Sequence, residues 1–282
     1  MNKRLYFLII IILLVTSNSS NAQKLTITDQ SKSALSLELR IDDYDIKEIN
    51  DGKEILHEVA LSSIMIPNDK GKPNLPSVNR FIAVPNNAKA KVVVNNYKKE
   101  ILKNINIAPS RGIVSEYDTT NSDYIKDSDI YSKDELFPAN IVSITEDINL
   151  RGVEAIGLNI SPIQYNPVKK ELIVYTEIEL SIEYEGGDSK FGDDRLRSMH
   201  WDPILQHNIL NYNSLPEINY SERFQQWIAD DAEGAEYLII IPDDESFRED
   251  AQRLADYRSK QGIITKVYSL NEMNAHSHEE IR

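Results

Sequence analysis

The segment LIVYTEIELSIEY, residues 172–184, constrains the fold of this chain more than any other stretch. Its even-numbered positions carry apolar side chains apart from Thr176, and its odd-numbered positions from Glu177 onward carry Glu or Ser. Successive side chains of a β-strand point to opposite faces, so a period of two predicts one face in a core and the other in water. This pattern is typical of an antiparallel sheet with one solvated face.

The rest of residues 23–187 repeats short apolar runs separated by clusters of Asn, Asp, Gly and Pro, such as PNDKGKPNLP at 67–76. The spacing predicts further strands within residues 25–29, 35–41, 57–66, 80–85, 90–102, 140–150 and 154–163. QYNP at 164–167 and the Lys-Lys pair at 169–170 suit a hairpin turn before residue 172. The polar stretch 110–139 predicts a long loop that is either functional or a tolerated insertion. We therefore expect a mainly β chain with an antiparallel, β-sandwich-like domain at 23–187.

Residues 1–22 have the pattern of a Sec-type signal peptide. Lys3 and Arg4 precede an apolar run at 5–15, and small polar residues lead to Ala22. The apolar run is shorter than the roughly 20 residues of a membrane span. We expect recognition by a bacterial-type export machinery, cleavage between Ala22 and Gln23, and a product that is secreted, extracellular or at the cell surface, with no stable membrane span after processing.

The composition excludes several kinds of site. The chain has no cysteine, which excludes a thiolate nucleophile, a thiolate zinc site and an iron–sulfur cluster within these residues. A net charge of −14 repels phosphate backbones, so no nucleic-acid partner is expected. His276 and His278 fit the polar start of a helix better than a metal site, and we expect neither a metal nor a cofactor.

The remaining residues change in character. EGGDSKFGDDR at 185–195 contains three of the chain's ten glycines and several charges, and a stretch with Pro and Asn follows. Residues 188–234 therefore predict a connector with a short helix at about 203–210, exposed from residue 211 onward. Within 235–282, the apolar run YLIII is followed by helical spacing of apolar residues, by Gly262, and by a second apolar run at 263–269. This order predicts a βαβ unit whose first strand is buried on both faces.

A single βαβ unit has too little core to be a domain. We therefore expect the truncated first unit of an α/β domain that continues beyond Arg282. No G-x-G-x-x-G or G-x-S-x-G motif occurs, and the acids of Pro242-Asp243-Asp244 would repel a pyrophosphate. The residues by themselves indicate no catalytic site.

Four stretches resemble, in order and spacing, the N-terminal propeptide of gingipain-type cysteine peptidase precursors: 71–84, 106–114, 135–153 and 161–180. Residues 237–270 resemble the first strand, helix and second strand of the family's caspase-like catalytic domain. The resemblance implies a secreted precursor whose β domain assists folding and covers the active-site cleft of its own catalytic domain in cis. The family's catalytic His and Cys belong to later strands, so no catalytic residue is assigned and the chain alone is expected to be inactive.

The resemblance also implies two roles for basic side chains. In arginine-specific members, a basic residue shortly after A-P-S-[basic]-G plugs the specificity pocket, and an arginine follows an Asn-Tyr pair at the processing junction. Here residues 108–112 keep the first motif, but the later basic position is Glu116, and Asn213 follows the Asn-Tyr pair. Arg111 and Arg223 are the candidates for the inhibitory or processing role.

Two alternatives stay open. One is a non-enzymatic exported surface or secretion-associated binding protein that retains the family architecture, which the downstream sequence would separate from a peptidase by the presence or absence of the His and Cys. The other is a family member devoted to processing or attaching exported proteins, which substrate profiling would separate from a digestive protease.

Overall fold

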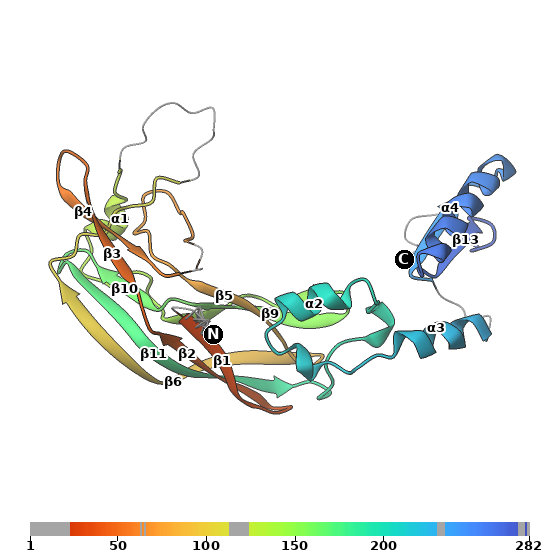
Figure 1. The fold of residues 1–282 in the computed structure, drawn as a ribbon, viewed down its shortest axis with the longest axis horizontal. Coiled ribbons are helices and arrows are strands. Elements are labelled where there is room, and N and C mark those ends of the chain that lie inside the picture. The colour runs from red at the N-terminus through yellow and green to blue at the C-terminus, as the bar shows by residue number, and fades with distance from the viewer. Residues whose placement is uncertain are drawn as a thin grey trace, which may run out of the picture. The chain divides into compact units, whose positions relative to one another are not determined.

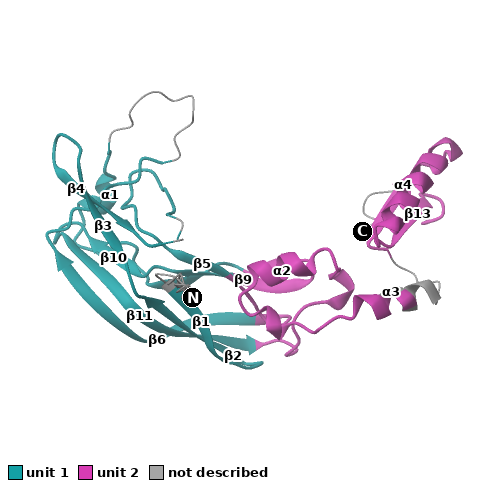
Figure 2. Cartoon of the chain, in the orientation of Figure 1, with its two compact units in different colours: residues 1–80, 89–146, 157–185 teal, residues 81–88, 147–156, 186–282 magenta. Residues whose placement is uncertain are grey.

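The chain is described by a computed structural model that covers residues 23–62, 64, 66–112, 124–229, 235–275 and 280. The predicted signal segment 1–22, Glu116, His276 and His278 lie outside these residues. Two compact units divide the chain, as Figure 2 shows: unit 1 comprises residues 1–80, 89–146 and 157–185, and unit 2 comprises residues 81–88, 147–156 and 186–282. Among the described helices, none has the length and apolar character to cross a membrane.

Unit 1 is built on a five-stranded sheet around the long strand β11 (Figure 1). Its strands are β1 (Gln23–Gln30), β2 (Ala34–Ile41), β6 (Ala88–Lys103), β10 (Ile163–Asn166) and β11 (Glu171–Gly186). β11 runs antiparallel to both β2 and β10. The predicted strand 172–184 is therefore confirmed and extends further at both ends. The hairpin turn predicted from QYNP and the Lys-Lys pair is present at 167–170, while residues 163–166 form β10.

The alternation in β11 produces the core of this sheet. Ile178, Leu180 and Ile182 are each 0% exposed. They lie opposite Leu39, Leu37 and Leu35 of β2, which are also buried. Burying an aliphatic side chain of this size contributes about 1.5–3 kcal/mol. At the other end of β11, residues 172–175 are buried on both faces, since the acids of the second half are absent there.

The remaining strands are shorter than the sequence indicates. β3 (Asp45–Asn50) and β4 (Ile55–Ala60) form an antiparallel hairpin, of which only β4 was predicted. The predicted strand 140–150 divides into β7 (Val142–Ile144) and β8 (Ile148–Leu150), and both pair with β9 (Val153–Ile160). β5 (Val78–Ala83) completes this sheet. The predicted strand 154–163 stops at Ser161-Pro162, where proline cannot donate to the ladder.

In unit 2, the connector contains more structure than an exposed linker. It contains η1 (Asp194–Leu196), α2 (Asp202–Asn208), η2 (Tyr212–Ser214) and α3 (Tyr220–Ala229). The predicted short helix corresponds to α2. The prediction of exposure is wrong for Asn211 and Leu215, which are 1% and 8% exposed.

The predicted βαβ unit is present. β12 (Tyr237–Ile241) pairs in parallel with β13 (Thr265–Ser269), and η3 (Glu245–Phe247) and α4 (Arg248–Lys260) connect them. Asp244 accepts a hydrogen bond from the Ser246 amide at 2.9 Å, which caps the helical segment. Gly262 follows α4 with φ +80°, as a C-terminal cap requires. Burial of β12 on both faces is not found in the described residues, because Tyr237 and Leu238 are 40% and 43% exposed.

Candidate functional site

The motif at 108–112 lies in unit 1 on a backbone that is bonded to two other segments. His57 donates its amide to the Asn106 carbonyl at 2.7 Å, and Ala108 donates to the His57 carbonyl at 2.9 Å. Ser110 donates to the Lys72 carbonyl and accepts from the Gly71 amide, both at 2.8 Å. All of residues 106–110 are buried. The path of the chain up to Arg111 is therefore set by paired backbone groups and not by solvent.

Asn106 links this backbone to the residues that follow position 123. Its Nδ2 donates to Glu54 Oε2 at 2.9 Å and to the Ile55 carbonyl at 3.0 Å. Lys126 Nζ donates to Asn106 Oδ1 at 3.2 Å and to Glu54 Oε1 at 2.5 Å. The Lys126 hydrogen bond is the main cause of the lowered pKa of Glu54. One network thus binds the chain on both sides of residues 113–123.

His57 and Tyr131 complete this network. His57 Nδ1 lies 3.1 Å from the Asn106 amide nitrogen and 3.4 Å from the Asn106 carbonyl oxygen. Tyr131, at the end of α1 (Ser128–Tyr131), donates its hydroxyl to the Ile107 carbonyl at 3.0 Å. Burial raises the pKa of Tyr131, so its hydroxyl stays a neutral donor. Both side chains serve the backbone of the motif, and neither has the surroundings of a catalytic base.

Arg111 itself is exposed at the end of this supported backbone. Its guanidinium carbon lies 5.1 Å from the centre of the Tyr124 ring, and the Tyr124 hydroxyl donates to Glu58 at 3.4 Å. Residues 113–123 connect Arg111-Gly112 to Tyr124 in the sequence. A cation over an exposed aromatic ring contributes about 0.5–1 kcal/mol, so the contact orients the guanidinium without burying it.

In unit 2, a buried ion pair that was not predicted organises the connector. The Arg197 and Asp202 side chains are only 1% and 11% exposed. Arg197 Nε and Nη2 donate to the two Asp202 carboxylate oxygens at 3.0 and 2.7 Å. Nη1 donates to the Pro216 carbonyl at 2.5 Å, and the Tyr212 hydroxyl donates to Asp202 Oδ2 at 3.1 Å. Burial of this kind is tolerated because every charged group is paired.

The Asn-Tyr pair at the expected processing junction has a structural role here. Asn211 Oδ1 accepts the Ala83 amide at 2.8 Å, and Asn211 Nδ2 donates to the Ala83 carbonyl at 2.9 Å. Tyr212 belongs to the Arg197–Asp202 cluster. The only sequence signal for the cluster is the Asp202-Pro203 start of a helix, and it does not identify the partner of Asp202.

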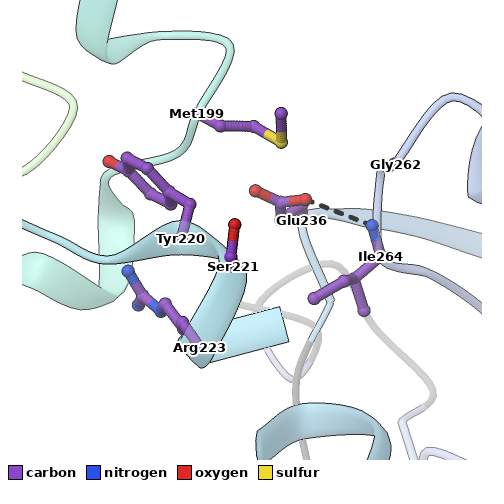
Figure 3. Close-up of a pocket in the computed structure, with 7 residues that line it drawn as sticks. All are labelled: Met199, Tyr220, Ser221, Arg223, Glu236, Gly262 and Ile264. Carbon is purple, nitrogen blue, oxygen red and sulfur yellow. Dashed lines mark hydrogen bonds between the residues drawn. The ribbon is translucent and has the colours of Figure 1, made fainter. Parts of the chain in front are cut away.

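The other candidate, Arg223, lies within α3. Its amide donates to the Asn219 carbonyl at 3.0 Å, and Asn219 Oδ1 caps the helix through the Glu222 amide at 3.1 Å. Figure 3 shows Arg223 among the residues that line a cavity of about 220 Å³, together with Met199, Tyr220, Ser221, Glu236, Gly262 and Ile264. Glu236 accepts the Ile264 amide there at 3.1 Å. The cavity has no arrangement of nucleophile and base.

One acidic group in unit 1 has the spacing of metal ligands. Carboxylate oxygens of Glu38, Glu177 and Glu179 lie within 4.8 Å of one another. Arg40 binds Glu38 at 2.7 Å and Lys98 binds Glu177 at 3.0 Å. Two of the three acids are thus paired with cations, and the group is explained as an ion-pair ladder across the sheet.

These features define a class of protein: a β-rich, antiparallel domain with a hydrogen-bonded segment at 106–112, followed by a βαβ unit. The family model Propeptide_C25 matches residues 16–215, most of the chain. The chain belongs to this family, and its resemblance to a gingipain-type propeptide is confirmed.

Gingipain R2 of Porphyromonas gingivalis strain W83 is 25% identical over 247 residues, which cover 86% of this chain and 32% of that protein. Gingipain R1 of the same species is 26% identical over 257 residues, which cover 88% of this chain and 24% of that protein. The chain thus spans a third or less of these relatives. A solved complex of the Porphyromonas gingivalis RgpB pro- and mature domains matches with a TM-score of 0.59 and 26% identity, over 67% of this chain and 97% of that chain.

Proposed function

We propose that this chain is the N-terminal part of a secreted zymogen of a gingipain-like cysteine endopeptidase. The β domain acts in cis as inhibitor and folding aid of a caspase-like catalytic domain that begins at β12, and the catalytic His and Cys follow Arg282. Export uses residues 1–22, with cleavage between Ala22 and Gln23. The observation that carries the proposal is the match of residues 16–215 to the family model, supported by the RgpB complex of pro- and mature domains.

Within this function, Arg111 is the inhibitory side chain. It stands at the end of a backbone that is bonded to residues 57, 71 and 72, and Tyr124 orients its exposed guanidinium. A guanidinium matches a pocket built for arginine substrates, because it presents the same planar set of donors. Glu116 carries the wrong charge for that pocket.

Inhibition in trans tests this proposal. Purified residues 23–282 are titrated into the mature peptidase of gingipain R2 with an arginine peptide as substrate, and we expect inhibition. Arg111→Ala should raise the inhibition constant at least tenfold. Arg80→Ala is the matched control, because Arg80 is exposed and its guanidinium donates to the neighbouring Asn79 carbonyl at 2.7 Å. Absence of inhibition by the unaltered chain would contradict the latency role, whereas equal inhibition by Arg111→Ala would contradict only the role of Arg111.

The chain itself is expected to have no peptidase activity. Thiol catalysis needs a thiolate beside an imidazole, and these residues contain no cysteine. Thiol-dependent cleavage of any peptide by purified residues 23–282 would contradict this expectation.

The second candidate is a non-enzymatic exported binding protein with the same architecture. Two departures favour it: Glu116 and Asn213 replace the basic residues that the family uses for inhibition and processing. Sequencing the reading frame beyond Arg282 separates the two functions. A histidine and a cysteine at the ends of successive strands support the peptidase, and their absence supports the binding protein.

A further inference from the structure

We propose that Arg197, Asp202 and Asn211 form a clamp that protects the chain up to Pro216, and that residues 217–219 are the proteolytic processing site of the precursor. This inference rests on the proposed function, because it places the cut that separates propeptide from peptidase.

The clamp holds residues 211–216 by both ends. Asn211 is fixed to the backbone of Ala83, and the Pro216 carbonyl is bound by Arg197 Nη1. Between them, Ser214 donates to the Asn211 carbonyl and Leu215 donates to the Tyr212 carbonyl, both at 2.9 Å. A peptidase binds its substrate as an exposed, extended strand, so it would have to break these bonds first.

The ion pair makes this arrangement costly to open. The Arg197 side chain is 1% exposed and donates four hydrogen bonds: two to Asp202, one to the Tyr212 hydroxyl and one to the Pro216 carbonyl. Its Nη1 also lies 3.7 Å from Asp194 Oδ1. Moving Pro216 away would break the hydrogen bond of a buried guanidinium donor and leave it only this longer ionic contact, which is unfavourable. Residues 211–216 are therefore held by backbone pairing and by the buried side chains of Asn211 and Leu215, while Asn213 and Pro216 are exposed.

Protection ends at Pro216. Glu217 and Asn219 are exposed and Ile218 is half-buried, and residues 217–219 form no helix, strand or turn. The next residue begins α3, where the Asn219 carbonyl and side chain bind the first turn. Residues 217–219 are thus the segment that a peptidase can bind in an extended conformation. The clamp precedes this segment and the capped helix α3 follows it.

An independent observation agrees with this boundary. The family match ends at residue 215, next to the last residue that the clamp holds. Arg223, the candidate suggested by the sequence, lies inside α3 and is reached only after the helix unwinds. The clamp therefore moves the expected cut away from Arg223 and toward the residues before the helix.

The sequence of the segment limits the enzyme that cuts it. Water adds to the carbonyl carbon of the peptide bond, the C–N bond breaks, and the products are a carboxylate on one fragment and an amino group on the other. Residues 217–219 are Glu, Ile and Asn, without arginine or lysine. The processing peptidase therefore accepts an acidic, aliphatic or amide side chain, and it is not restricted to basic residues.

Limited proteolysis of residues 23–282 tests the inference, with subtilisin as a probe of broad specificity and mass spectrometry of the fragments at early times. We expect the first cuts within the connector at 217–219 and none at 211–216. Arg197→Met should bring cuts into 211–216 and raise their rate at least tenfold. The matched control is Arg195→Met, because Arg195 is 86% exposed and pairs with Asp193 at the surface.

Tyr212→Phe provides a second variant that keeps the ring but removes its hydrogen bond to Asp202. It should raise the cutting rate at 211–216 by a smaller factor. If circular dichroism shows that Arg197→Met does not fold, the Tyr212→Phe variant alone tests the inference. Three results would each overturn the inference. The unaltered chain could be cut early at 211–216, its first connector cuts could fall in α3 or after it, or the folded variants could show unchanged cutting patterns. The pattern does not depend on inhibition of a peptidase, so failure here and failure of the latency role are distinguishable.

Discussion

The side-chain amide of Asn211 hydrogen-bonds both the amide nitrogen and the carbonyl oxygen of Ala83, as a neighbouring β-strand would. Asn211→Ala removes both of these hydrogen bonds to buried backbone groups, and each lost bond costs about 1–3 kcal/mol. We expect the free energy of unfolding to fall by about 2–4 kcal/mol, measured by urea denaturation. The exposed Asn213 provides the control, and Asn213→Ala should change stability by less than about 0.5 kcal/mol. Equal effects of the two substitutions would show that the Ala83 bonds add nothing.

Asp202 gives the connector a defined pH dependence. Burial alone raises the pKa of Asp202, but the hydrogen bond and charge of Arg197, with Tyr212, outweigh it and lower the pKa below its ordinary value. Because the folded pKa is lowered, the stabilisation is complete above the unfolded value of about 3.9 and is lost as pH falls through the folded value. The difference in unfolding free energy between the unaltered chain and Asp202→Asn should therefore be constant near neutral pH and shrink below about pH 4. A difference that grows in acid would contradict this sign.

The strands show which parts of the fold local sequence could predict. In β11, residues 178–184 alternate between apolar and polar side chains, and the apolar ones are buried. This pattern was sufficient to predict the strand and its buried face. β3 was missed because its half-buried side chains, Ile46 and Ile49, are three residues apart and the rest of the strand is exposed. Its existence depends on pairing with β4, where Ile46 lies opposite Val59. Such pairing is a tertiary effect that overrides weak local propensity.

The candidate site was predictable in its position but not in its supports. The 108–112 motif indicated Arg111 directly. Its supports, Glu54 and Lys126, are 72 residues apart, and they bind each other and Asn106. Similarly, the Arg197–Asp202 pair holds the connector because Arg197 binds the Pro216 carbonyl. That carbonyl is a backbone group, so no pattern of side chains in the sequence reveals the contact. Contacts between residues so far apart in the sequence form only in the folded chain, so the local periodicity of the sequence does not predict them.

Gly152 tests how closely η1 packs in unit 2. Its φ is +80°, and an added Cβ would lie 2.8 Å from Leu196 Cβ and 2.9 Å from the Asp193 carbonyl oxygen. Gly152→Ala should lower the free energy of unfolding by the backbone strain, about 1–2 kcal/mol, plus about 1–3 kcal/mol of overpacking. Gly52→Ala isolates the strain, since Gly52 has φ +85° and nothing within 4 Å of the added Cβ. Thermal or urea unfolding measures both, and the packing argument fails if the two variants are equally stable.

The Glu54–Lys126 pair, which connects the two sides of residues 113–123, should contribute modestly and only while Glu54 is ionised. The side chains are 44% and 27% exposed, so solvent screening limits their coupling to about 0.3–1 kcal/mol. The lowered pKa of Glu54 means that this stabilisation is full above the ordinary value of about 4.3 and is lost as pH falls through the folded value. A double-mutant cycle with Glu54→Gln and Lys126→Met should therefore give a coupling near pH 7 that declines as the pH falls below the ordinary value of about 4.3.

The Asp69–Lys72 pair is the matched control for this cycle. It also joins a carboxylate to a lysine, at 3.1 Å, but its side chains are 60% and 43% exposed and contact no such network among the described residues. Its coupling should be close to zero at neutral and acidic pH, because exposed pairs at this spacing contribute little. If the Glu54–Lys126 coupling persists undiminished in acid, the two side chains act through packing and the ionic account of the network is wrong. If instead both pairs couple equally near pH 7, the partial burial beside Asn106 adds nothing to the strength of the pair.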